Sequence, residues 1–101
     1  MKITVKTGYK ESFKIGKKAL GQLSISISEC SFDEGYITGF TKTSFLSWGE
    51  IIELEFFEIS NNKTVIQISS EASAQMISWG RNKRNLLRIK DKIYEILKSR
   101  R

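Results

Sequence analysis

A cluster of cations where the last helix is expected to begin has the residue types best suited to binding chemistry. Glycine, and then arginine, lysine and asparagine residues, follow one another between positions 80 and 88. The free N–H groups and the positive dipole end of a helix N-terminus can bind an anion. Cations at this end of a helix interact unfavourably with the helix dipole. Their presence therefore indicates a functional requirement and not a contribution to helix stability. The predicted ligand or anion site consists of Trp48, Trp79, Gly80, Arg81, Asn82, Lys83, Arg84, Asn85 and Arg88.

Each feature of this site also has a simpler interpretation. Both tryptophans stand in a Ser-Trp-Gly sequence, at 47–49 and 78–80. They either line the mouth of a pocket or plug the ends of the core, where a tryptophan buries on the order of 150–250 Å². The cations either bind an anion or only solvate the helix. Asn82 either belongs to the site or caps the helix. These alternatives stay open at the level of sequence.

Catalytic and metal-binding chemistry has little support in the sequence. There is no histidine, which removes the commonest general base and metal ligand. The single Cys30 has no histidine to activate it and no second cysteine to form an internal disulfide. The four candidates for acid–base pairs are glutamates that are expected to face solvent: Glu50, Glu53, Glu55 and Glu58. No phosphate loop or dinucleotide fingerprint is present. We therefore predict no enzyme, no cofactor and no metal.

Charge is divided among three segments of the chain, which carries a net charge of +6. Residues 1–20 have six lysines and one glutamate, 21–80 have two lysines and eight acids, and 81–101 have nine bases and two acids. One interpretation is that basic helices and acidic strands attract one another and keep the protein in solution. The sharper one is an anion-facing surface on the last helix. The acidic strands would repel a phosphate backbone, which disfavours nucleic acid as a partner.

Hydrophobic spacing predicts the elements that would position these residues. The expected elements are a strand at 2–6, a helix at 9–20, strands at 23–28 and 36–43, a strand that begins at 47–49, a strand at 64–70 and a helix at 81–98. Turns are expected at 33–35 and 60–63, and Gly21 is expected to cap the first helix in the left-handed conformation. Gly16 inside that helix costs about 1 kcal/mol against alanine, which close packing on a neighbour would justify.

The last helix has two distinct faces when wound at 100° per residue. The face expected to pack on the sheet consists of Asn82, Leu86, Ile89, Ile93, Ile96 and Leu97. The opposite stripe consists of Arg81, Arg84, Arg88, Lys92 and Glu95. We predict one α+β domain over residues 1–101, with a single antiparallel sheet of about five strands in the order β-α-β-β-β-β-α and the long C-terminal helix packed on it.

From Phe45 onward the chain resembles a family of small uncharacterised bacterial domains. The resemblance rests on Ser-Phe-Leu-Ser-Trp-Gly-Glu-Ile-Ile, a hairpin, Ile-Ser-Ser-Glu-Ala-Ser and Trp-Gly-Arg-Asn-Lys-Arg-Asn-Leu, with Gly80, Asn82 and Asn85 on a Gly-x-Asn-x-x-Asn/Arg signature. These domains look like reduced relatives of the START and pollen-allergen helix-grip proteins, and the element order is similar to half of the TATA-binding protein. The resemblance implies an apolar ligand between sheet and helix. The acidic sheet departs from a DNA-binding saddle.

Together these observations predict a non-enzymatic helix-grip module that binds a small apolar or anionic ligand, or a protein partner, at the mouth between sheet and helix. The alternative is a basic adaptor that binds anionic lipid headgroups or nucleic acid through the C-terminal helix. A homodimer is a further candidate arrangement. The lone Cys30 and the absence of a signal-peptide pattern at the N-terminus predict a cytoplasmic location.

Overall fold

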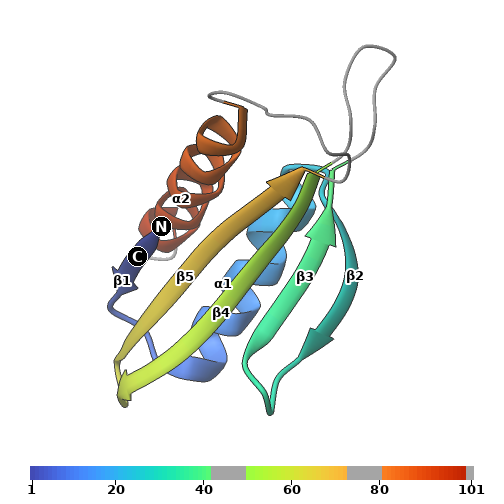
Figure 1. Cartoon of the computed structure of the whole chain (residues 1–101). Helices are drawn as coiled ribbons and strands as arrows, with labels where there is room; N and C mark the ends of the chain where they lie inside the picture. Colours follow the sequence, from blue (N-terminus) through green and yellow to red (C-terminus); the bar gives the residue numbers. More distant parts are fainter. Residues whose placement is uncertain (42–49, 73–80, 100–101) are drawn as a thin grey trace.

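The chain forms one antiparallel sheet with two helices against the same face (Figure 1). The structure is a computed structural model that describes residues 1–41, 50–72 and 81–99. Its elements are β1 (Lys2–Val5), α1 (Tyr9–Gln22), β2 (Ser26–Ser31), β3 (Tyr36–Phe40), β4 (Glu50–Ser60), β5 (Lys63–Ala72) and α2 (Arg81–Ser99). The α+β class, the element order and the packing of the last helix on the sheet confirm the predicted fold class.

The strand order in the sheet is β1-β5-β4-β3-β2, and every neighbouring pair is antiparallel. Helix α1 carries the chain from β1 at one edge to β2 at the other. The chain then returns strand by strand until β5 pairs with β1. Met1 extends that pairing, because its amino group donates to the Ile68 carbonyl at 2.9 Å and its carbonyl accepts from the Ile68 N–H at 2.6 Å. The first and last strands of the chain are therefore neighbours in the sheet.

Alternate residues of the central strands point toward the helices and form the core. On β4, Ile52, Leu54 and Phe56 are buried, whereas Glu53 and Glu55 lie half-buried on the opposite face. The sequence predicted this alternation, which follows from the two-residue period of a strand. The face away from the helices is called the open face below.

The inner face of α2 agrees with the predicted helical spacing. Ile89 and Ile93 are fully buried, and Ile96 is nearly so. Leu86 and Leu97 are partly buried at the margins of the same cluster. Each fully buried isoleucine stabilises the fold by about 1.5–3 kcal/mol. The predicted inward position of the Asn82 side chain lies outside the described residues.

Helix α1 packs tightly on β4 at Gly16. A Cβ atom at this position would lie 2.7 Å from Cζ of Phe56 and 3.2 Å from Cδ1 of Leu54. The close packing expected from a glycine inside a helix is therefore present. At the start of the helix, Ser12 is fully buried and donates its hydroxyl to the Gly8 carbonyl at 2.8 Å.

The end of α1 differs from the prediction that Gly21 caps it. The helix continues to Gln22, and the residue with positive φ is Ser24, at 61°. The Ile25 N–H bonds to the Leu20 carbonyl at 2.9 Å and the Ser24 N–H to the Gly21 carbonyl at 3.1 Å, which is a Schellman motif. Such motifs are accompanied by an apolar contact across the cap. Leu20 and Ile25 are both buried and can supply it, whereas a cap at Gly21 would have placed polar Gln22 there.

This later helix end also shifts the next strand. β2 begins at Ser26 and not at position 23, because the left-handed Ser24 interrupts an extended chain. β3 ends at Phe40, and the last two positions of the strand predicted at 36–43 lie outside the described residues. β5 continues to Ala72, two residues beyond the strand predicted at 64–70.

The two predicted turns are confirmed. Gly35 has φ of 75° between β2 and β3, a conformation that glycine adopts without strain. Asn61 and Asn62 join β4 to β5, and the register shifts between Glu58 and Ser60 just before this turn.

Candidate functional site

The structure places part of the predicted site at the start of α2. The first turn of α2 consists of Arg81, Asn82, Lys83 and Arg84. The structure describes only the backbone of these four residues. Asn85 is half-buried and Arg88 is exposed. The predictions on Trp48, Trp79 and Gly80 lie outside the described residues. The prediction that these nine residues form one site is therefore not tested by the described residues.

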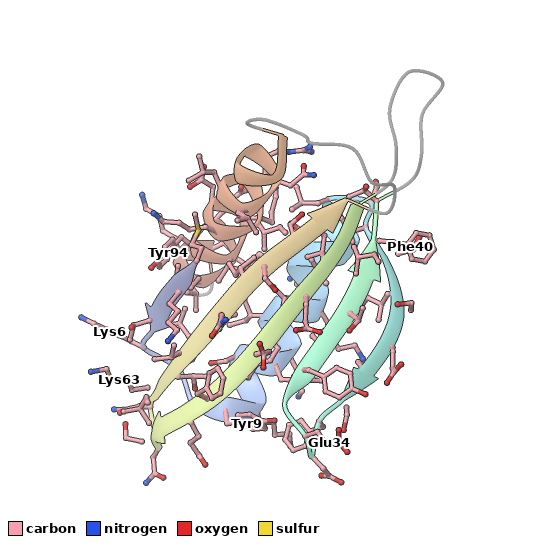
Figure 2. The ribbon with its side chains drawn as sticks, viewed as in Figure 1. Lys6, Tyr9, Glu34, Phe40, Lys63 and Tyr94 are labelled. Carbon is pink, nitrogen blue, oxygen red and sulfur yellow. The ribbon has the colours of Figure 1, made fainter. Side chains whose placement is uncertain are left out.

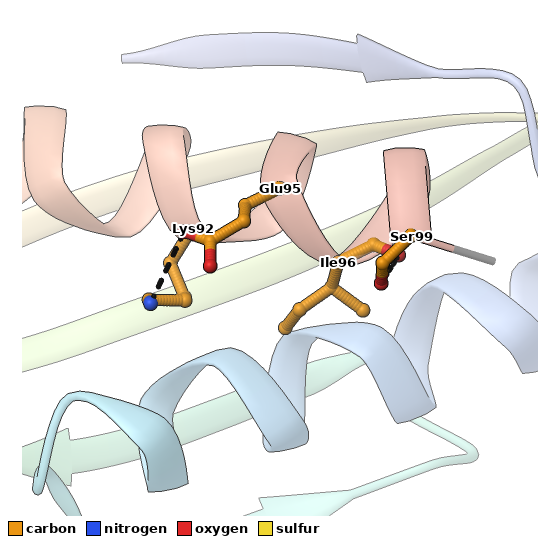
Figure 3. Close-up of polar contacts among 4 residues, drawn as sticks. All are labelled: Lys92, Glu95, Ile96 and Ser99. Atoms are coloured by element: carbon orange, nitrogen blue, oxygen red, sulfur yellow. Dashed lines mark hydrogen bonds and ion pairs between the residues drawn. The ribbon is translucent and has the colours of Figure 1, made fainter.

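A larger basic surface emerges from the packing of the two helices. α1 and α2 run antiparallel, side by side, on the same face of the sheet (Figures 1 and 3). The buried residues of α1 face the sheet, so its lysines point away from it. The exposed cations of this helical layer are Lys10, Lys14, Lys17 and Lys18 on α1 and Arg88 and Lys98 on α2. The sequence predicted that both helices are basic, but it predicted an anion-facing surface on α2 alone.

The acids of the helical layer neutralise only part of this charge. Lys92 Nζ lies 3.2 Å from Glu95 Oε2, an i,i+3 pair (Figure 3). Such an exposed helical pair contributes about 0.3–0.5 kcal/mol. Within the described part of the chain, no ion pair engages the four α1 lysines. The described side chains of the two helices comprise eight bases and three acids, so the layer stays strongly basic.

The open face of the sheet carries the opposite charge. Glu53 lies between Thr38 of β3 and Ser69 of β5, and Glu55 lies between Tyr36 and Gln67. On β2, Glu29 pairs with Thr38 and accepts a hydrogen bond from the Tyr36 phenol. The sheet therefore separates a basic helical layer from an acidic open face.

Two tyrosines have raised pKa values, Tyr36 chiefly through a hydrogen bond to a carboxylate and Tyr9 chiefly through burial. The hydrogen bond to Glu29, with smaller contributions from desolvation and nearby acids, raises the pKa of Tyr36 to about 12. Burial, followed by the charges of Asp33 and Glu58, raises the pKa of Tyr9. Tyr9 donates its hydroxyl to the Phe32 carbonyl and packs edge-on to the Phe32 ring, with centroids 5.0 Å apart. Both tyrosines therefore act as neutral hydrogen-bond donors at physiological pH.

A hollow of about 670 Å³ lies between β1 and the last turns of α2. Figure 2 shows Lys6 and Tyr94 on this side of the molecule. The residues lining it are Thr4, Val5, Lys6, Thr7, Tyr94, Leu97 and Lys98. Sequence reasoning missed it, because β1 and α2 are at opposite ends of the chain and no local pattern signals that they meet.

Metal sites, membrane spans and similarity to known proteins are three further indicators of function. Within the described ranges, no group of three His, Cys, Asp or Glu side chains could hold a metal ion. None of the helices described there is both long enough and apolar enough to cross a bilayer. No protein-family model and no curated protein matches the chain. The predicted resemblance to small bacterial helix-grip domains therefore stays a prediction.

Proposed function

We propose that this chain is a non-catalytic adaptor that binds anionic lipid headgroups through its helical layer. One observation carries the proposal: α1 and α2 present their cations on the same side of the molecule, while Glu29, Glu53 and Glu55 of the sheet lie on the other. Each lysine or arginine near an anionic bilayer contributes about 1 kcal/mol. Six exposed cations would then give about 6 kcal/mol, which corresponds to a dissociation constant of roughly tens of micromolar.

The shape and composition of the layer favour lipid over nucleic acid. Both helices lie flat on the sheet, so neither projects as a recognition helix must to enter a DNA groove. The α1 cations are all lysines, whose ammonium groups act as point charges and lack the planar fork of arginine. A flat, lysine-rich surface suits a plane of headgroups. The predicted ligand at the sheet–helix mouth remains a separate prediction, since that mouth lies outside the described residues.

The proposal can be tested by sedimentation with vesicles of phosphatidylcholine alone or with about a third phosphatidylserine. We expect binding only to the anionic vesicles, with affinity falling steeply as salt rises above physiological strength. The triple variant Lys14→Gln, Lys17→Gln, Lys18→Gln should bind roughly a hundredfold more weakly.

A matched control variant distinguishes binding through the helical layer from binding through net charge alone. The triple variant Lys2→Gln, Lys6→Gln, Lys63→Gln removes the same number of lysines from outside the two helices, and its binding should change little. Equal losses in the two triple variants would show that only net charge matters and would overturn the proposal. Tight binding to a DNA duplex, with none to vesicles, would identify nucleic acid as the partner instead.

A further inference from the structure

The open face of the sheet has an internal order that solvation alone does not require. Along β4, residues 51, 53, 55 and 57 point to this face. Ile51 pairs with Phe40 at one end, and Phe57 pairs with Val65 at the other. The side chains of Phe40, Ile51 and Phe57 are 45%, 41% and 45% exposed. Figure 2 shows Phe40 projecting from the end of β3. The face thus has two apolar ends.

The centre between these ends consists of carboxylates without cationic partners. Glu53 and Glu55 are half-buried, and no hydrogen bond or ion pair engages either one among the described residues. Their cross-strand neighbours are uncharged: Thr38, Ser69, Tyr36 and Gln67. A half-buried carboxylate is stabilised by a nearby cation. Among the described residues, no ion pair engages either carboxylate, and Lys2 of β1 lies two strands away from Glu55, beyond Gln67. A basic partner would supply the missing cations.

The spacing of these groups selects the shape of the partner. Ile51 and Phe57 are six strand residues apart, about 20 Å at 3.3 Å per residue. In a helix, about 14 residues span the same length, and positions i and i+14 share a face. Positions i+4, i+7 and i+11 lie on that face between the anchors. An apolar–basic–apolar helix therefore matches the open face in length, charge and periodicity.

We propose that the open face binds a basic amphipathic helix of a partner protein, laid along β4. Its two apolar anchors contact the Phe40–Ile51 and Phe57–Val65 pairs, and its cations pair with Glu53 and Glu55. The helix would cover the sheet on the side opposite α1 and α2. This site is on the other face from the proposed lipid surface, so either proposal can fail without the other.

The test uses a designed peptide probe. It is an alanine-based helix with leucines at i and i+14 and lysines at i+4, i+7 and i+11. Binding to the whole chain is followed by fluorescence anisotropy and by NMR of the backbone amides. We expect the shifted amides to lie on β3, β4 and β5. A peptide with glutamates replacing the lysines should not bind.

Variants of the protein test whether the peptide binds to the open face or to the helical layer. Glu53→Gln, Glu55→Gln should weaken binding roughly tenfold, since it removes two ion pairs that are partly shielded from water. Asp91→Asn, Glu95→Gln removes the same charge from the helical layer and should leave the affinity unchanged. Both variants are checked for folding by circular dichroism.

Three outcomes would overturn the proposal. These are no binding at millimolar peptide, equal losses in the two double variants, and shifts confined to α1 and α2. Sedimentation equilibrium of the chain alone supplies a further check. Self-association abolished by Glu53→Gln, Glu55→Gln would show that a second copy, and not a basic helix of another protein, occupies the face.

Discussion

Tyr36 on β3 donates its phenol hydrogen to a carboxylate oxygen of Glu29 on β2. This bond exists only while the phenol is protonated. The folded state therefore holds the proton more tightly than the unfolded chain, whose tyrosines titrate near the ordinary value of 10.0. The contribution to stability is fully present below about pH 10 and is lost as the pH rises toward the folded-state pKa of about 12.

Spectrophotometric titration of the tyrosines tests this residue-scale prediction. Glu29→Ala should move the late tyrosine transition from about 12 toward 10.0, because both the hydrogen bond and the negative charge are removed. Tyr36→Phe should remove that transition altogether. Glu95→Ala, on the far side of the molecule, should leave the curve unchanged. A Tyr36 transition that does not respond to Glu29→Ala would contradict the assignment.

Two glycines of α1 have opposite roles at the scale of the element. Gly16 lies against β4, where an added methyl group would meet Phe56 at 2.7 Å. Gly21 lies in the last turn, with nothing within 4 Å of an added Cβ. Both are inside the helix, so at each position glycine has a lower helix propensity than alanine would have. The difference between them is therefore entirely one of packing.

Alanine substitution should stabilise the protein at position 21 and destabilise it at position 16. Gly21→Ala should raise the free energy of unfolding by up to about 1 kcal/mol. Gly16→Ala should lower it by about 1–3 kcal/mol, since overpacking at the β4 contact exceeds the propensity gain. Urea unfolding monitored by circular dichroism measures both values. Stabilisation by Gly16→Ala would show that the Phe56 ring moves aside at little cost.

At the scale of the whole molecule, α2 covers the part of the sheet where the first and last strands meet. Ile93 is fully buried there, whereas Leu87 on the same helix is 39% exposed. Ile93→Ala should destabilise the fold by about 2–5 kcal/mol, a large share of the stability of a small domain. Leu87→Ala should cost much less. Thermal unfolding compares them, and equal losses would contradict the observed orientation of α2.

The layered distribution of charge also belongs to the whole molecule. Lysines at positions 10–18 and bases at positions 88–98 are far apart in the chain, yet they share one layer. Glu53 and Glu55 of β4 lie on the other side of the sheet. The vesicle and peptide experiments address these two sides separately. Together they would define an adaptor with two oppositely charged surfaces.

The local patterns of the sequence were sufficient to predict the elements and their inward faces. Ile52, Leu54 and Phe56 alternate with glutamates, and Ile89, Ile93 and Ile96 recur at helical spacing. The cap of α1 was predicted wrongly, because Leu20 and Ile25 set the helix end through burial in the core. The predicted site was tested little, since its tryptophans lie outside the described residues.

By itself, the sequence determined which residues are helical or extended and which side of each element is apolar, because these properties depend on spacings of a few residues. Only the tertiary structure decided that β1 pairs with β5, that α1 lies beside α2 and that the charges separate into two layers. Those relations arise from packing between segments distant in the chain. The same packing forms the helical layer and the open face, on which both proposed functions depend.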